Sequence, residues 1–240
     1  MTLLTDPAAS FGFSLERVVL ERTGQRVLNE VTLEVNQARV GLIGNNGSGK
    51  SSLVRLLNGL LKPTSGEVRV NGRNPADGPE AIAGQVGFIF QNPDHQIIFP
   101  TVLEEVAFGL RNLGRSRKAA QAEALAFLET QGRADWAQRP VHSLSEGQKQ
   151  LVCIFAVLVM QPKLIVLDEP FSALDYPTRL HVLNWLHQLP QQLLMISHEL
   201  DCLDGFDRLI WLDNGQVRGD GEPARILDAY RQASLAGVTL

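Results

Sequence analysis

Apolar positions in the early part of the chain recur with the two-residue period of β-strands. Val31, Leu33 and Val35 alternate with polar residues, and strands are expected at residues 15–20, 27–35 and 39–43. A helix is expected at 52–60, a turn at 63–66 and a short strand at 67–70, which ends at Asn71-Gly72. Short strands separated by such turns predict a small antiparallel sheet near the N-terminus. Residues 74–79 are loop-like, and 86–90 have the pattern of a buried strand.

A helical period replaces this alternation from about residue 101 to residue 136. The apolar positions that define it are Val102, Val106, Phe108, Leu110, Leu113, Ala122, Leu125 and Leu128. The apolar run at 151–160 is about half as long as a membrane span and indicates a buried helix. Together these segments predict a helical subdomain at about 92–160, inserted in an α/β core.

The strand pattern resumes at residues 164–167, an all-aliphatic run typical of a central parallel strand. A helix at 176–188, strands at 193–196 and 208–212, a turn at Asn214-Gly215 and a helix at 223–232 follow. The pattern predicts an α/β fold with a mostly parallel core sheet, an antiparallel N-terminal sheet and the helical subdomain. All of it is expected to form one domain, 1–240.

Composition narrows the class of protein. The chain has 240 residues, 44% of them hydrophobic, which is enough to bury a full core, and its net charge of −4 argues against a nucleic-acid partner. Residues 1–10 lack the basic and apolar regions of a signal peptide. Cys153 and Cys202 lack metal-ligand spacing and are expected to be buried, reduced thiols. We expect a soluble protein that reaches a membrane only through a partner.

A glycine-rich segment lies between the strand at 39–43 and the helix at 52–60. Its residues, Gly44-Asn45-Asn46-Gly47-Ser48-Gly49-Lys50-Ser51, have the G-x-x-x-x-G-K-S spacing of a P-loop. The glycines permit a tight turn whose N–H groups form an anion-binding nest at a helix N-terminus. Lys50 can then reach nucleotide β- and γ-phosphates, and the Ser51 hydroxyl can ligate Mg²⁺. This segment, with Ser52, therefore predicts a nucleotide site.

Two acids end the aliphatic strand at 164–167. Asp168 and Glu169 would lie at the C-terminal edge of a buried strand, where ligands bind in α/β proteins. Asp168 is placed to hold Mg²⁺, directly or through water, and Glu169 to polarise a water for in-line attack on a γ-phosphate. A solvated strand end is the alternative for these acids taken alone, and the preceding P-loop disfavours it.

A third segment, Leu144-Ser145-Glu146-Gly147-Gln148, precedes the apolar helix. Ser145 is a candidate N-cap, and the N–H groups at this helix start suit a phosphate. Taken alone, the pattern fits an ordinary helix cap equally well. Its place between a P-loop and a strand that ends in two acids makes it far more specific.

The order of the motifs resembles an ABC-type ATPase over nearly the whole chain. The ordered motifs are the P-loop, Gln91, the segment 144–148, Leu167-Asp168-Glu169-Pro170, Ser172-Ala173-Leu174-Asp175 and Ser197-His198. The resemblance implies a P-loop NTPase fold of the ABC type, with ATP and Mg²⁺ as ligands. It implies that Gln91 senses Mg²⁺ and the attacking water, and that His198 contacts the γ-phosphate.

The resemblance also implies a second subunit. Ser145, Gly147 and Gln148 correspond to the signature motif, which completes the ATP site of the opposite subunit, and Asp175 belongs to the D-loop. The expected assembly is a head-to-tail dimer, of the chain with itself or with a paralogous ATPase, that holds two ATP molecules between its subunits.

Two positions depart from the family pattern. Glu146 replaces the first glycine of the signature, so its carboxylate must point away from the phosphate or lower the affinity for ATP. Arg22 stands where the family carries an aromatic residue that stacks on adenine, and a guanidinium plane can stack on a base too. An exposed arginine at a strand end, with adenine held otherwise, is the alternative.

A narrower resemblance covers the segment after Gln91. Residues 91–102 and 104–109 are similar to the Q-loop region of ATPases from energy-coupling-factor (ECF) vitamin and metal transporters, and 148–153 look most like the biotin type. Cobalt- and nickel-type ATPases share the rest. In these transporters the segment docks the coupling helices of a membrane scaffold, so that Gln96, Ile97, Ile98 and Phe99 are the expected scaffold contacts. Local packing against the helical subdomain is the alternative.

The resemblance therefore implies an ATPase subunit at the cytoplasmic face of the cell membrane. Its partners would be an integral membrane scaffold and a substrate-binding membrane subunit, with no nucleic acid. It would energise uptake of a vitamin, biotin being favoured, or of a transition metal ion. The alternatives are an ABC importer that uses a periplasmic binding protein and a soluble non-transport ABC ATPase. The gap between Gln91 and Leu144 is too short for the coiled coil of a DNA-repair ATPase.

Overall fold

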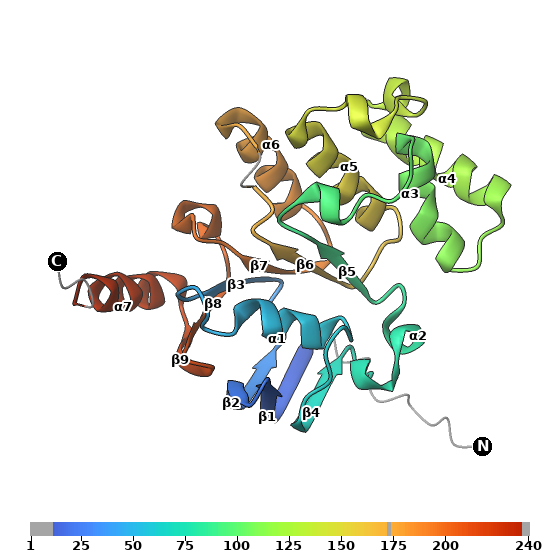
Figure 1. Cartoon of the computed structure of the whole chain (residues 1–240). Coiled ribbons are helices and arrows are strands. Elements are labelled where there is room, and N and C mark those ends of the chain that lie inside the picture. The colour runs from blue at the N-terminus through green and yellow to red at the C-terminus, as the bar shows by residue number, and fades with distance from the viewer. Residues whose placement is uncertain (1–11, 172–173, 237–240) are drawn as a thin grey trace, which may run out of the picture. The chain divides into compact units, whose positions relative to one another are not determined.

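The computed structural model describes residues 12–171 and 174–236 (Figure 1). The chain divides into two compact units: Met1–Val86 with Gln192–Leu240, and Gly87–Gln191. Ser172 and Ala173 of the expected D-loop lie outside the described residues, as do residues 1–10, over which a signal peptide was not expected.

An antiparallel sheet in the first unit confirms the prediction for the N-terminal region. It contains β1 (Phe13–Arg22), β2 (Gln25–Val35) and β4 (Ser65–Val70), in the order β2-β1-β4. Leu15 pairs with Leu33 on one side and with Val68 on the other, and all three are buried. Their shared face packs on α1 (Lys50–Leu57), which contacts β2 and β4. This packing positions the helix that follows the P-loop.

The first unit also holds strands of the core sheet. β7 (Gln192–Ile196), β3 (Arg39–Ile43) and β8 (Arg208–Asp213) are parallel neighbours in that order. β9 (Gln216–Gly221), which the pattern did not predict, pairs antiparallel with β8 through the expected Asn214-Gly215 turn. The helix α7 (Pro223–Ala236) contacts β8 and β9. All residues of β3 are buried.

Two local predictions in this unit were wrong at their edges. The helix expected at 52–60 begins at Lys50 and ends at Leu57, because Gly59 takes a left-handed conformation that stops it. The segment expected as a loop at 74–79 contains the 3₁₀ turn η1 (Pro75–Asp77) and the start of the short helix α2 (Pro79–Ile82). The Asn74 side chain accepts from the Ala76 N–H and so initiates that turn.

The second unit combines two neighbouring strands with four helices. The strands are β5 (Val86–Ile89) and β6 (Leu164–Asp168). The helices are α3 (Val102–Asn112), α4 (Arg117–Thr130), α5 (Glu146–Leu158) and α6 (Tyr176–His187). The 3₁₀ turns η2 (Pro93–His95), η3 (Ala134–Trp136) and η4 (Val141–Ser143) join them. Residues 92–160 thus carry α3, α4 and α5, as the periodicity predicted.

The buried face of α4 differs from the predicted one. Ala120, Ala124 and Leu128 are fully buried in the cluster that α3 and α5 form, whereas Ala122 and Leu125 are exposed. Two alanines four residues apart make a shallow ridge that lets α4 approach its neighbours closely. The prediction counted the larger Leu125 as a core position and therefore assigned the wrong buried face to this helix.

The tryptophans are buried or partly buried, and the two cysteines are buried as predicted. Trp136 and Trp211 are buried, and Trp185 is partly buried against the same helical cluster. Cys153 and Cys202 are buried thiols. Within residues 12–171 and 174–236, no helix has the length and apolar character needed to cross a membrane.

Candidate functional site

The P-loop follows β3 directly and takes the conformation that its glycines allow. Gly44, Gly47 and Gly49 have φ angles of 147°, 81° and 104°. A Cβ on Gly44 would collide with the Leu212 carbonyl oxygen, and one on Gly49 would lie 2.9 Å from the Val27 carbonyl oxygen. Gly44 and Gly49 are required both by their backbone conformation and by the close approach of neighbouring chain, and Gly47 by its backbone conformation alone.

Lys50 and Ser48 are the buried polar residues of this loop. The Lys50 Nζ donates to the carbonyl oxygens of Gly44 at 2.7 Å and Asn45 at 2.9 Å, which holds the ammonium inside the curve of the loop. The Ser48 hydroxyl is buried and has no hydrogen-bond partner among the described residues. Buried polar atoms are normally paired, so an unpaired hydroxyl here fits a loop that receives an oxygen-rich ligand.

His198 leaves the sheet at the same edge as the P-loop. β3 and β7 are parallel neighbours, with Leu42 opposite Ile196, so the segments that follow them start side by side. The Ser197 hydroxyl exchanges hydrogen bonds with the backbone of Glu199, at 3.0 Å to the carbonyl and 3.1 Å from the N–H. This turn leaves His198 exposed. The first unit therefore contains both the predicted phosphate loop and His198, the histidine predicted to contact the γ-phosphate.

Gln91 and Glu169 come together in the second unit. They follow the neighbouring strands β5 and β6, and the Gln91 Nε2 donates to the Glu169 Oε2 at 3.3 Å. Asp168 and Glu169 are both half-buried at the end of β6. Glu169 has a φ of 50°, a conformation that costs a residue with a Cβ free energy and that clusters at functional sites.

Ser145 caps α5 as predicted, and Gln148 completes the cap. The Ser145 Oγ accepts from the Gln148 N–H at 3.3 Å, and the Gln148 Oε1 accepts from the Ser145 N–H at 3.1 Å. This reciprocal pair is a capping box. The S-x-x-Q spacing signals this arrangement in the sequence, although only the serine cap was predicted.

The signature residues line a hollow of about 740 Å³ with the start of α6. Ser145, Gly147, Gln148 and Asp175 all line it, so predicted signature and D-loop residues share one surface. Glu146 lines the same hollow and is exposed.

Two further residues of this hollow were not predicted to belong to the site. Arg133 and Trp136 line it, and the Arg133 guanidinium lies 5.1 Å from the Trp136 ring centroid. This cation–π contact places a positive charge on the same surface as Glu146 and Asp175. No spacing in the sequence links η3 to the start of α5, so the sequence pattern could not indicate that Arg133 and Trp136 line the same hollow as the signature.

Asp175 caps α6. Its Oδ1 accepts from the Thr178 N–H at 2.8 Å. Hydrogen bonds from the Thr178 side chain, and then from its backbone, hold the pKa of this exposed carboxyl below its ordinary value of 3.8.

Arg22 lies at the end of β1, exposed and paired with Gln25 across the hairpin. This position is compatible with both of its predicted roles. A residue that the pattern missed, Tyr230 of α7, donates its hydroxyl to the Asn45 Oδ1 of the P-loop at 3.3 Å. The Tyr230 ring lies edge-on to Trp211 at 5.4 Å, which fixes that side chain over β8.

The segment expected to contact a scaffold is partly exposed. The Ile98 side chain is 69% exposed, whereas Gln96, Ile97 and Phe99 are half-buried. The three apolar residues line a shallow hollow of about 290 Å³. An ion pair of 2.7 Å between the Lys149 Nζ and the Asp94 Oδ1 forms part of its rim. An apolar centre with a charged rim is the composition of a protein-binding surface.

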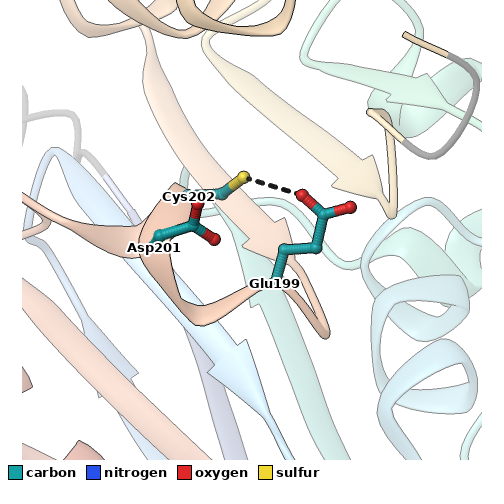
Figure 2. A group of neighbouring side chains, drawn as sticks. All are labelled: Glu199, Asp201 and Cys202. Atoms are coloured by element: carbon teal, nitrogen blue, oxygen red, sulfur yellow. Dashed lines mark hydrogen bonds between the residues drawn. The ribbon is translucent and has the colours of Figure 1, made fainter. Parts of the chain in front are cut away.

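A group of possible metal ligands follows His198. Figure 2 shows the carboxylates of Glu199 and Asp201 beside the Cys202 thiol, with ligand atoms within 4.8 Å of one another. The Cys202 Sγ donates to the Glu199 Oε2 at 3.7 Å. Cys202 is buried and the two acids are exposed. The hydrogen bond between Cys202 and Glu199 explains this grouping of side chains without a bound metal.

Comparisons with known proteins agree with this geometry. A family model described as ABC transporter matches residues 28–172. The biotin transport ATP-binding protein BioM of Rhodobacter capsulatus is 48% identical, over 91% of this chain and 94% of its own length. The energy-coupling factor transporter ATP-binding protein EcfA1 of Latilactobacillus sakei is 38% identical, over 87% of this chain and 76% of its own.

Among solved structures, the dimeric post-hydrolysis state of the ATP-binding cassette MJ0796, bound to ADP and Pi, is 25% identical. The similarity extends over 88% of this chain and 98% of the MJ0796 chain, with a TM-score of 0.75. The chain belongs to the ABC transporter family. It has the P-loop ABC ATPase fold and is an ATP-binding, ATP-hydrolysing subunit of a transporter.

Proposed function

We propose that the chain hydrolyses Mg²⁺-ATP with residues of both units, which act as one cassette over 1–240. The P-loop amides and Lys50 hold the phosphates, Glu169 is the general base, and His198 and Gln91 orient the γ-phosphate and the attacking water. The hydrogen bond from Gln91 to Glu169 carries this proposal, because it places an amide beside the carboxylate that must activate water.

Ser51 and Asp168 are proposed as the protein ligands of Mg²⁺. Both offer the oxygen ligands that this ion prefers, and neither is fully buried, so water can complete its coordination. When bound, the ion neutralises charge on the β- and γ-phosphates. Arg22 is proposed to stack on adenine, and its exposure at the end of β1 leaves its guanidinium accessible to a base.

Replacing Glu169 with Gln tests the chemistry. The amide cannot accept a proton from water, so turnover should fall about a hundredfold or more while ATP binding is retained. Steady-state ATPase rates and the dissociation constant of a fluorescent ATP analogue measure the two effects. Glu129→Gln, on an exposed position of α4, is the control and should hydrolyse ATP like the wild type. A Glu169→Gln variant with full turnover would show that another group is the base.

The ATP site is proposed to be completed by a second subunit in a head-to-tail dimer. That subunit is another copy of this chain or a paralogous ATPase. Ser145, Gly147 and Gln148 would face its P-loop, and Asp175 on the same hollow supports this assignment. Glu146 lines the hollow, so we propose that its carboxylate lowers the affinity of the composite site for ATP.

The transporter is proposed to be an ECF-type importer of biotin. The names of the R. capsulatus and L. sakei relatives support this assignment. The subunit would bind at the cytoplasmic face of the membrane to an integral scaffold, which carries a separate substrate-binding membrane subunit. A short cytoplasmic helix of the scaffold is the proposed occupant of the apolar surface formed by Ile97, Ile98 and Phe99.

Co-production with candidate membrane subunits tests this class. A tagged chain should retain a scaffold protein and a small membrane protein after solubilisation in mild detergent. Membrane vesicles that contain this complex should accumulate labelled biotin only with ATP. Transport that depends on a soluble periplasmic binding protein would assign the chain to another importer class instead.

A further inference from the structure

Glu105 is a buried carboxylate directly beneath the proposed docking surface. It lies in the first turn of α3 and is 4% exposed, although the neighbouring Glu104 is half-buried. Burying a carboxylate is unfavourable unless hydrogen bonds replace its water. A charged residue on the same helix face as Val102 and Val106 therefore requires specific partners.

The partners of Glu105 are two consecutive backbone groups of the docking segment. Its Oε2 accepts from the Ile98 N–H at 2.9 Å and from the Phe99 N–H at 2.8 Å. Hydrogen bonds to a charged acceptor are stronger than neutral ones, and both amides lie outside any helix or strand. One carboxylate oxygen thus fixes the backbone at the centre of the segment.

This anchor explains which side chains reach solvent. Ile97 packs on the helical core, Phe99 lies 4.9 Å from the Phe108 ring of α3, and Ile98 between them is 69% exposed. With both neighbours held inward, Ile98 is presented outward in one fixed place. An apolar anchor held in its bound position loses less entropy on association.

A second set of contacts fixes the start of the segment on α5. The Gln96 side chain accepts from the Phe90 N–H at 3.2 Å and donates to the Cys153 carbonyl at 3.3 Å. Gln150, which is fully buried, donates to the Phe90 carbonyl at 3.2 Å. α5 begins with the signature residues, so the docking segment is held by the same helix that carries the signature.

We propose that Glu105 is a positioning residue for scaffold docking: its carboxylate holds residues 97–99 in the conformation that the scaffold helix binds. This inference rests on the docking surface proposed above. It assigns to Glu105 no contact with the scaffold and no part in hydrolysis. Glu105 acts through the backbone of Ile98 and Phe99.

Four variants test the proposal in the complete chain, co-produced with the membrane subunits. Glu105→Ala removes the acceptor and should reduce retention of the scaffold at least tenfold. Glu105→Gln keeps a carbonyl oxygen that can accept hydrogen bonds from both N–H groups, and this variant should restore most of the scaffold retention. Glu104→Ala is the matched control on the same turn and should bind like the wild type, because among the described residues the Glu104 side chain bonds only the Thr101 hydroxyl. Ile98→Glu should abolish retention.

Amide hydrogen exchange of the chain without membrane subunits provides a second readout. The peptide that covers residues 97–99 should exchange at least tenfold faster in Glu105→Ala and not in Glu104→Ala. Unchanged exchange or full scaffold retention in Glu105→Ala would overturn the role of Glu105. If Ile98→Glu retains the scaffold, the docking surface itself is wrong. Loss in Ile98→Glu with retention in Glu105→Ala would overturn the positioning role alone.

Discussion

At the scale of single residues, several predicted site residues also hold the local structure. Gln148 lines the signature hollow while its side chain closes the capping box of α5. Glu169 accepts from Gln91 while its backbone takes a left-handed conformation. Asp175 lines the signature hollow while it caps α6. Substitution of such a residue changes both roles, so stability has to be measured beside activity.

Asp175 should make the cap of α6 depend on pH. Its pKa is held below 3.8 in the folded chain, so the stabilisation is fully present above that value and is lost as the pH falls through the lowered pKa. Asn at this position caps the helix without titrating. The unfolding free energy of the wild type relative to Asp175→Asn should be constant above about pH 5 and decrease below about pH 4, by linkage.

Denaturant unfolding at several pH values measures this difference. Parallel decreases in the wild type and in Asp175→Asn would show that the Asp175 cap does not contribute to the pH dependence.

At the scale of secondary-structure elements, α4 shows how packing overrides a hydrophobic pattern. Its exposed Leu125 is larger than its buried Ala120 and Ala124, and the buried pair makes a four-residue ridge against the helical cluster. A period fitted to residue hydrophobicity alone gives weight to the leucine. The contacting face is decided by how closely two helices can approach.

Replacing Ala124 with Leu should destabilise the chain by about 1–3 kcal/mol, because the added methylenes overpack a filled interior. Ala122→Leu, on the exposed side of the same helix, should change the stability by less than about 0.5 kcal/mol. Thermal and urea unfolding of both variants measure the two effects. Equal destabilisation by the two substitutions would contradict the observed face of α4.

The elements and motif residues with strong local signals were predictable from the sequence. Residues 40–43 of β3 and 164–167 of β6 are continuous apolar runs, and the P-loop is defined by its spacing. β9 was missed because Gln216–Gly221 holds three polar residues and two glycines, and its pairing depends on β8 rather than on its own pattern. Long-range contacts such as Tyr230 with Asn45, or Arg133 beside the signature, leave no local signal. Glu105 did leave a local signal in the sequence, because it is an acid on an apolar helix face.

At the scale of the whole molecule, the predicted residues fall into two groups. The P-loop and His198 belong to one unit, and Gln91, Glu169 and the signature belong to the other. The family places the chain among transporter ATPases, and the dimeric structure of a related cassette, bound to ADP and Pi, is consistent with two subunits that share each site. We propose that ATP joins two chains through the signature of one and the P-loop of the other.

Light scattering of the Glu169→Gln variant tests this claim most directly. With Mg²⁺-ATP the mass should double from the 26.4 kDa of one chain, since bound ATP is not hydrolysed and keeps the dimer closed. With ADP, or with Ser145→Arg added to block the signature surface, the mass should stay at that of a single chain. A Glu169→Gln protein that stays monomeric at saturating Mg²⁺-ATP, or a Ser145→Arg form that dimerises equally well, would contradict a composite site formed by two copies of this chain.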